Sequence, residues 1–198
     1  MNFIDRLAHS CTQFIRANHE NSASEKVLFY ALSLTINTLL AYSTVIIICS
    51  FTGHFLSGLL VVIFYTLLRV ISGGVHFSTS LRCCIYTIVL FVCIGHTDLS
   101  FSTYYCGTIL TVVSLLILAI TAPQGLKNQS RIDEKYYPAL KIASLIVVSS
   151  NFIIGSSTLA LVYFAQAMHT TRIIHLLFGK LDSLFDQFTR KEVTKFEN

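Results

Sequence analysis

Long apolar runs constrain the fold of this chain more than any other feature of its sequence. A membrane span needs about 20 mostly apolar residues, and five runs meet or approach that length, at 27–49, 55–71, 83–95, 104–122 and 139–168. The last run is too long for one span, and the segment Gly155-Ser156-Ser157 is the natural place to divide it. We therefore predict an all-α polytopic membrane protein with about six transmembrane helices.

The composition assigns the whole chain to the membrane. Of its 198 residues, 54% are hydrophobic and 12% are charged, and the mean hydropathy is +0.67, so the chain is far more apolar than an ordinary soluble domain. We predict one membrane-embedded domain over residues 1–198. It would consist of an interfacial helix at 1–24, a transmembrane core at 25–178 and a cytoplasmic amphipathic tail at 179–198.

Both ends of the chain carry apolar residues at helical spacing. They are Phe3, Ile4, Leu7, Cys11, Phe14 and Ile15 near the start, and Leu177, Leu181, Leu184, Phe185 and Phe188 near the end. These stripes predict amphipathic helices, which could lie in the membrane interface or pack against the protein itself. Charged residues interrupt the first 24 positions, which is unlike the continuous apolar core of a cleaved signal peptide.

The basic residues fall on alternate loops of the predicted topology. Lys and Arg precede the first span, flank the second loop, fill the fourth loop and follow the last span, whereas the loops near Gly53, His96 and Gly155 contain none. Cytoplasmic loops carry the excess of Lys and Arg. We therefore expect both termini and the segment from Arg69 to Cys83 to lie in the cytoplasm. The net charge of +4 would then face the lipid headgroups of the bilayer.

A short polar segment between the second and third spans holds the residue types that covalent catalysis requires. It reads Arg69-Val-Ile-Ser-Gly-Gly-Val-His76-Phe-Ser-Thr-Ser-Leu-Arg-Cys83. A thiolate is a strong nucleophile and an imidazole titrates near neutrality, so His76 and Cys83 can form an acyl-enzyme if the fold brings them together. The adjacent Gly73-Gly74 predicts the end of one helix, and the polar residues at 78–80 predict the start of the next. Cys83 would then lie in a first helical turn, where the positive helix end and Arg82 favour a thiolate.

The segment has to bend for this pair to react. A continuous helix would separate the two α-carbons by roughly 10 Å, which is too far for base activation. A turn over residues 77–80 would fold His76 back toward Cys83. The alternative is that His76 caps a helix or contacts a headgroup, and that Cys83 is only a small interfacial residue.

The sequence leaves the remaining catalytic groups open. Asp133 and Glu134 could orient His76, although exposed loop charges are more often simply solvated. Backbone N–H groups at the start of the Cys83 helix are the natural donors to an oxyanion.

The pattern of Arg69, Gly73-Gly74, His76 and Cys83 resembles the signature of the accessory gene regulator B family, membrane-embedded cysteine endopeptidases of quorum-sensing systems. The resemblance implies that His76 is the base, that Cys83 is the nucleophile, and that Arg69, Gly73 and Gly74 support them. Chain length, span count and the pair Ala122-Pro123 before a basic stretch are also similar. Cys84 departs from the pattern, because it places a second thiol beside the first.

The resemblance also implies a substrate and a reaction. The substrate would be a short precursor peptide with an amphipathic leader and an acidic C-terminal tail. The enzyme would release the tail through a thioester on Cys83 and permit the signal segment to cyclise to a thiolactone or lactone. Basic residues of the fourth loop could receive the tail by charge complementarity: Lys127, Arg131, Lys135 and Lys141.

Other functions find less support in the sequence. A small transporter would be expected to show an internal repeat or an acidic residue within a span, and neither is evident. A peptide-binding membrane scaffold without catalysis would explain the basic face but not the segment from Arg69 to Cys83. We expect no metal and no cofactor, because the His and Cys residues do not form ligand patterns. We expect the lipid bilayer and the peptide as partners and no nucleic acid, and packing between membrane helices would also allow a second copy of the chain as a partner.

Overall fold

The computed structural model describes residues 2–19, 23–75, 77–97, 106–124 and 133–196, with side chains to residue 187. The described residues form helices and no strand, which confirms the all-α prediction. An isolated bridge joins Gly73 to Gln124. In chain order the helices are α1 (Phe3–Asn18), α2 (Glu25–Phe51), α3 (Phe55–Ser72), α4 (Ser80–Gly95), α5 (Cys106–Thr121), the 3-10 turn η2 (Glu134–Tyr136), α7 (Tyr137–Ser149), α8 (Asn151–Ile154), α9 (Ser157–His169) and α10 (Arg172–Phe196).

Three of the described helical segments are long and apolar enough to cross a membrane. They are Glu25–Phe51, Phe55–Ser72 and Glu134–Ile154, and α4 and α5 are apolar but shorter. Large hydrophobic side chains lie exposed along these helices, for example Leu39 and Ile120, as a bilayer requires and water would not tolerate. The chain is therefore a helical membrane protein, and the count of six spans stays a prediction.

The long apolar run at 139–168 divides where the sequence predicted. α8 ends at Ile154, Gly155 adopts a left-handed conformation with φ of 66°, and α9 begins at Ser157. Asn151 is fully buried and holds this break together: its Nδ2 donates to the Ser156 carbonyl at 3.1 Å, and its Oδ1 accepts from the Ser156 amide at 3.1 Å. The same Nδ2 donates to Thr111 on α5 at 3.1 Å. The backbone groups that the break exposes are thus satisfied inside the protein.

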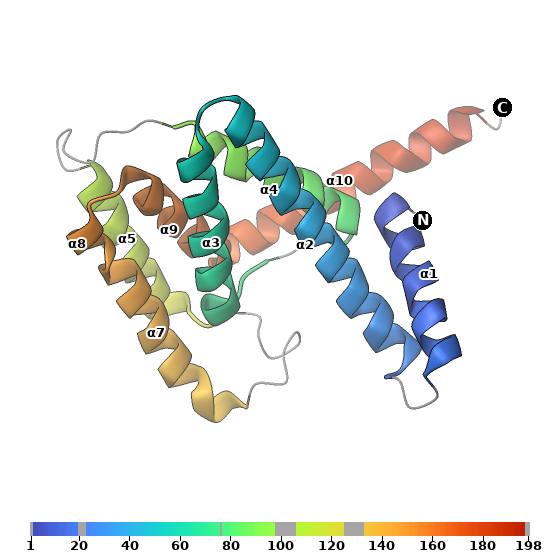
Figure 1. Ribbon diagram of the computed structural model, residues 1–198, viewed down its shortest axis with the longest axis horizontal. Helices are drawn as coiled ribbons and strands as arrows, with labels where there is room; N and C mark the ends of the chain where they lie inside the picture. The colour runs from blue at the N-terminus through green and yellow to red at the C-terminus, as the bar shows by residue number, and fades with distance from the viewer. Residues whose placement is uncertain (1, 20–22, 76, 98–105, 125–132, 197–198) are drawn as a thin grey trace.

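α3 lies at the centre of the bundle. It packs against α2 and α4 on one side and against α7 and α9 on the other, while α5 packs against α7 and α9 (Figure 1). Fully buried side chains from these helices fill the core between them: Val45, Val61, Leu68, Phe91, Leu118, Val148, Val162 and Tyr163. The arrangement brings the C-terminal ends of α3, α5 and α9 to one level, beside the start of α4.

The predicted N-terminal helix is α1, which runs beside α2 (Figure 1). Asn2 caps it by accepting from the Asp5 amide at 2.9 Å. Ile4 is buried in a cluster with Ala41 and Cys84, whereas the side chain of Phe14 is 71% exposed. One edge of α1 therefore packs on the protein, and the location of its exposed apolar residues in the membrane interface stays a prediction.

The C-terminal helix α10 buries a residue that the sequence stripe omitted. Phe178 is only 6% exposed, whereas Leu177, Leu181 and Leu184 of the predicted stripe are 42–49% exposed. Phe178 lies on the neighbouring helical stripe. The sequence predicted a surface or packing helix without naming the face that packs, and the structure shows that this face is the one that carries Phe178.

Gly58 marks a close approach of α3 to α2 and provides a test of the bundle. A Cβ at Gly58 would lie 2.7 Å from Cβ of Cys49, whereas one at Gly179 in α10 would meet nothing within 4 Å. Because α2 and α3 would have to separate, we expect Gly58→Ala to lower the free energy of unfolding by about 1–3 kcal/mol. Gly179→Ala should leave it unchanged or raise it by up to about 1 kcal/mol. Thermal unfolding in detergent measures both variants, and equal midpoints would contradict the close contact.

Candidate active site

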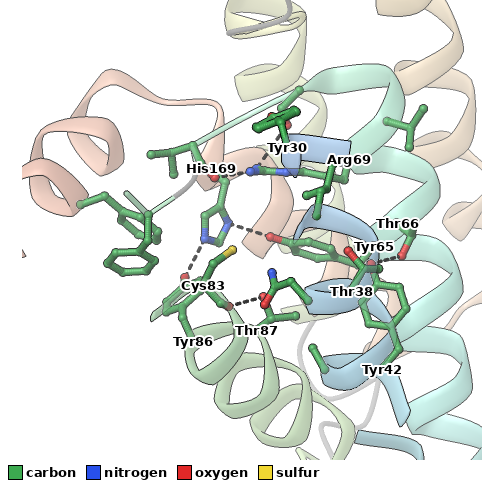
Figure 2. A pocket seen from close by; sticks show the side chains of 18 residues that line it. Tyr30, Thr38, Tyr42, Tyr65, Thr66, Arg69, Cys83, Tyr86, Thr87 and His169 are labelled. Atoms are coloured by element: carbon green, nitrogen blue, oxygen red, sulfur yellow. Dashed lines mark hydrogen bonds between the residues drawn. The ribbon is translucent and has the colours of Figure 1, made fainter. Parts of the chain in front are cut away.

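A pocket of about 350 Å³ lies where α2, α3, α4 and α9 meet, next to α10. Figure 2 shows the Cys83 sulfur and the His169 ring directed into it. Cys83, Arg69 and Gly73 of the predicted site line the pocket. His76 lies outside the described residues. The structure therefore brings Arg69, Gly73 and Cys83 together at the pocket. Gly74 does not line the pocket but lies next to the Arg69 side chain.

The two neighbouring thiols have different environments. Cys83 is half-buried and faces the pocket. Cys84 is 3% exposed and packs with Ile4 and Ala41 between α1, α2 and α4. Cys83 is therefore the one of the two that a ligand in the pocket could reach.

The 69–83 segment is not one continuous helix, as predicted, whereas the predicted approach of His76 to Cys83 falls outside the described residues. α3 ends at Ser72, Thr79 has an extended backbone with φ of −114° and ψ of 138°, and α4 begins at Ser80. Cys83 is consequently the fourth residue of α4, and its amide donates to the Thr79 carbonyl at 3.1 Å. The prediction that Cys83 belongs to a first helical turn is confirmed, but its own N–H is already used by the helix.

The two glycines allow backbones to pass in contact. Gly73 has φ of 73°. The amide of Gly74 donates to the Gln124 carbonyl at 3.0 Å, and the Gln124 amide donates to the Ser72 carbonyl at 3.0 Å. A Cβ at Gly73 would lie 2.0 Å from the Gln124 oxygen, and one at Gly74 would lie 2.1 Å from a nitrogen of Arg69. Glycine is therefore required at both positions by space as well as by conformation. Gln124 follows the cis peptide bond between Ala122 and Pro123.

Two side chains fasten the segment that leads to His76. Arg69 donates from its guanidinium to the carbonyl of Val75 and, at 3.4 Å, to that of Gly73. Gln166 on α9 is fully buried and donates to the Gly73 carbonyl at 2.7 Å and to the Ser72 hydroxyl at 2.9 Å. The geometry agrees with a supporting role for Arg69, because its charge is directed at backbone oxygens.

His169 contacts both flanks of the predicted catalytic pair. Its carbonyl accepts from the amide of Val75 at 3.2 Å, one residue before His76. Its ring Nδ1 lies 2.5 Å from the Ala165 carbonyl, so Nδ1 carries the proton and Nε2 accepts from the hydroxyl of Tyr86 at 2.6 Å. Tyr86 lies one helical turn after Cys83 (Figure 2).

Aromatic rings cover the side of the pocket next to α10. Phe77 stacks on Phe178 with ring centroids 4.3 Å apart, and Tyr86 and His169 meet Phe178 edge-on at 5.0 and 5.6 Å. Such a cluster excludes water through buried apolar area and favourable ring geometry. α10 thereby contributes a wall of the pocket.

Charged side chains attach α10 to the start of α4. Arg82 pairs with Asp186 at 2.7 Å and with Asp182 at 3.0 Å, and Asp182 also accepts from the Ser78 amide at 2.8 Å. The hydrogen bonds from Asp186 and Asp182 raise the pKa of Arg82 above its ordinary value. The cation next to Cys83 is therefore engaged by two carboxylates.

The basic residues predicted to receive the substrate's tail are only partly described. Lys127 and Arg131 lie outside the described residues. Lys135 is exposed, pairs with Asp133 at 3.1 Å and lies 5.0 Å from the ring centre of Tyr136. Lys141 is half-buried on α7. The pairing of Asp133 with Lys135 agrees with the view that this carboxylate is a solvated loop charge.

Sequence reasoning missed the residues that other elements bring to Cys83. It gave no role in the site to His169, Tyr86, Phe178 or Asn37, all of which line the pocket. Tyr86 and His169 are 83 positions apart. A local pattern cannot reveal such a contact, and the available signal was the presence of polar side chains within otherwise apolar helices.

These features define a helical membrane protein with a thiol in an aromatic-walled pocket at the end of its central helices. The sequence matches the model of the accessory gene regulator B family over residues 8–179, and the chain belongs to this family. The family takes part in the processing of quorum-sensing signal peptides. Comparisons with curated proteins and with solved structures found no match.

The contact between Gly73 and Gln124 can be tested against a matched glycine. Gly53 also has positive φ, at 80°, but nothing lies within 4 Å of the position of its Cβ. Both Gly→Ala variants should lose about 1–3 kcal/mol of stability to backbone strain. Gly73→Ala should lose more, because Gln124 has to move, and hydrogen exchange should accelerate at the amides of Gly74 and Gln124. Equal stability and unchanged exchange at these amides in both variants would refute the contact.

Proposed function

We propose that this chain is a cysteine endopeptidase that removes the C-terminal tail of a short precursor peptide and permits the remaining signal segment to cyclise. The observation that carries the proposal is the placement of Cys83. Its thiol opens into the pocket from the first turn of α4, and one residue, His169, contacts both neighbouring segments, through the Val75 amide before His76 and the Tyr86 hydroxyl after Cys83. Family membership supports peptide processing as the general activity.

In the proposed reaction His76 takes the proton of the Cys83 thiol, and the thiolate attacks the scissile carbonyl carbon to form a C–S bond. The tetrahedral intermediate collapses as the C–N bond breaks, and the imidazolium of His76 returns the proton to the leaving amine. The acidic tail departs, and the signal segment remains as a thioester on Cys83. A thiol or hydroxyl of the peptide then attacks the thioester, which releases Cys83 and closes a thiolactone or lactone.

The walls of the pocket support cyclisation over hydrolysis. A thioester is preserved only if water is kept from it until the internal nucleophile arrives. Phe77 and Phe178 stack at 4.3 Å beside the pocket, and Tyr86 completes the aromatic wall. Arg69, Gly73 and Gly74 serve this step indirectly, since they fix the chain that carries His76.

The substrate we propose has an amphipathic leader and an acidic tail. The leader would lie in the membrane interface, so that the scissile bond reaches Cys83, and the tail would meet basic residues of the loop before α7. We place this loop, both chain termini and the pocket on the cytoplasmic side, because the Lys and Arg residues gather there in the predicted topology.

Single substitutions at the adjacent cysteines test the nucleophile. Cys83→Ala should lower tail release by more than about a thousandfold, because the attacking atom is gone. Cys84→Ala should change it by less than about threefold, since Cys84 faces the core rather than the pocket. His76→Gln should resemble Cys83→Ala. The measurement is mass spectrometry of tail release and of the Cys83 adduct, with a synthetic acidic-tailed precursor peptide from the same genome.

The same experiment separates the proposal from its alternatives. A small transporter or a peptide-binding scaffold would be indifferent to Cys83→Ala, provided that the variant inserts into the membrane. Unimpaired cleavage by Cys83→Ala, or an adduct on Cys84, would refute the assignment of Cys83.

Charge neutralisation tests the binding of the acidic tail. A variant in which Lys127, Arg131, Lys135 and Lys141 are all replaced by Gln should raise KM by about tenfold, because each exposed pair contributes about 0.2–1 kcal/mol. The kcat value should be unchanged. A matched peptide whose tail carries Asn and Gln in place of Asp and Glu serves as the control. If KM rises equally for both peptides, the basic residues do not recognise the acidic tail.

A further inference from the structure

A tetrahedral intermediate on Cys83 needs hydrogen-bond donors for its oxyanion, and the nucleophile's own amide is not available. The Cys83 N–H is bonded to the Thr79 carbonyl at 3.1 Å as part of α4. The amide of Ser78, just before the helix, donates to Asp182 at 2.8 Å. Stabilisation of the developing charge is a large term in acyl transfer, so a side-chain donor in the pocket would add to what the first-turn amides of α4 can supply.

The register between α2 and α4 places Asn37 at the level of Cys83. The Ser33 and Ser80 hydroxyls meet at 2.8 Å. Two turns further along α2 and one turn further along α4, Ala41 packs with Cys84. Asn37 lies one turn after Ser33 and one turn before Ala41 on the same face of α2. Asn37 and Cys83 accordingly line the same pocket of about 350 Å³ and also share an adjoining pocket of about 290 Å³.

The carboxamide of Asn37 has hydrogen-bonding capacity that the fold does not use. The side chain is only 7% exposed, and its Oδ1 is buried with no hydrogen-bond partner among the described residues. A buried amide left unsatisfied costs stability, whereas an apolar residue of similar size would cost nothing. Asn37 therefore contributes nothing to packing that Leu could not supply. Its Nδ2 makes no hydrogen bond to a described residue either, and unlike Oδ1 it is not among the fully buried atoms, so its two N–H donors are available to a ligand in the pocket.

We propose that Asn37 is a catalytic residue that donates a hydrogen bond from Nδ2 to the oxyanion formed when Cys83 attacks the scissile carbonyl. This inference rests on the proposed peptidase function. The bond forms to the carbonyl oxygen as its negative charge develops and weakens when the thioester carbonyl re-forms, so it lowers the barriers for acylation and for cyclisation alike. No proton is transferred to or from Asn37.

The experiment measures tail release from a synthetic acidic-tailed precursor peptide from the same genome, with full-length protein in lipid vesicles. Asn37→Leu should lower kcat by about 10²–10³-fold with KM changed by less than about threefold, as expected for a contact made only in the transition state. Its thermal midpoint should be equal to or above that of the original protein. Alkylation of Cys83 by iodoacetamide, which forms no oxyanion, should proceed at the original rate.

Two further variants make the result decisive. Asn37→Ala removes the amide without filling its space, and it should show the same loss of kcat even if Leu disturbs folding. Thr35→Val changes an exposed hydroxyl on the lipid-facing side of α2 and should leave kcat unchanged.

Retention of kcat within about threefold in Asn37→Ala overturns the role of Asn37, and so does a loss of kcat that is matched by slower alkylation of Cys83. If Cys83→Ala also cleaves the peptide, the proposed function fails with it. If Cys83→Ala is inactive while both Asn37 variants are active, only this inference fails.

Discussion

The backbone contact between Gly73-Gly74 and Gln124 is the constraint on which the pocket depends. Two helices, α3 and α5, end at the same level within an apolar bundle, and neither their last carbonyl groups nor the amides of Gly74 and Gln124 beyond them have helical partners. Each segment supplies the other's partner, with N···O distances of 3.0 Å in both directions. Arg69 and Gln166 satisfy the remaining carbonyls from the side. A short segment can therefore cross the bundle end in a fixed position without water.

That fixed crossing determines where the chain goes next. Val75 is held by the His169 carbonyl and by Arg69, and the chain then returns through an extended Thr79 to start α4. The side chain of His169 holds Tyr86 on the first turns of α4. The segment that carries His76 and the helix that carries Cys83 are thus positioned against the same residue of α9, which limits their relative movement.

Features governed by local chemistry could be predicted from the sequence. The end of α3 at paired glycines, the break at Gly155 and the start of α4 before Cys83 all follow from backbone preferences of a few residues. The packing face of α10 could not be predicted, since in a membrane protein an apolar stripe faces lipid as readily as it faces the core. Periodicity therefore identified the helix but selected exposed leucines instead of Phe178.

The contacts of the site could not be predicted for a related reason. Neighbouring helical residues diverge by about 100°, so Cys83 and Cys84 must face different surroundings, but only the packing of α1 and α2 decides which thiol is buried. The partners Gln124, Gln166 and His169 come from segments far along the chain. Their positions follow from the bundle as a whole, and no spacing within the 69–83 segment encodes them.

Arg82 has a different role in the structure from the one its place beside the proposed nucleophile Cys83 suggested. The sequence suggested that its charge would assist a thiolate at Cys83, but the guanidinium is bound by Asp182 and Asp186, whose combined charge outweighs its own. Any assistance to the thiolate must therefore come from the backbone dipoles of α4. The function that remains for Arg82 is mechanical. It anchors α10 at the start of α4, which keeps Phe178 against Phe77 and preserves an apolar wall where a thioester would form.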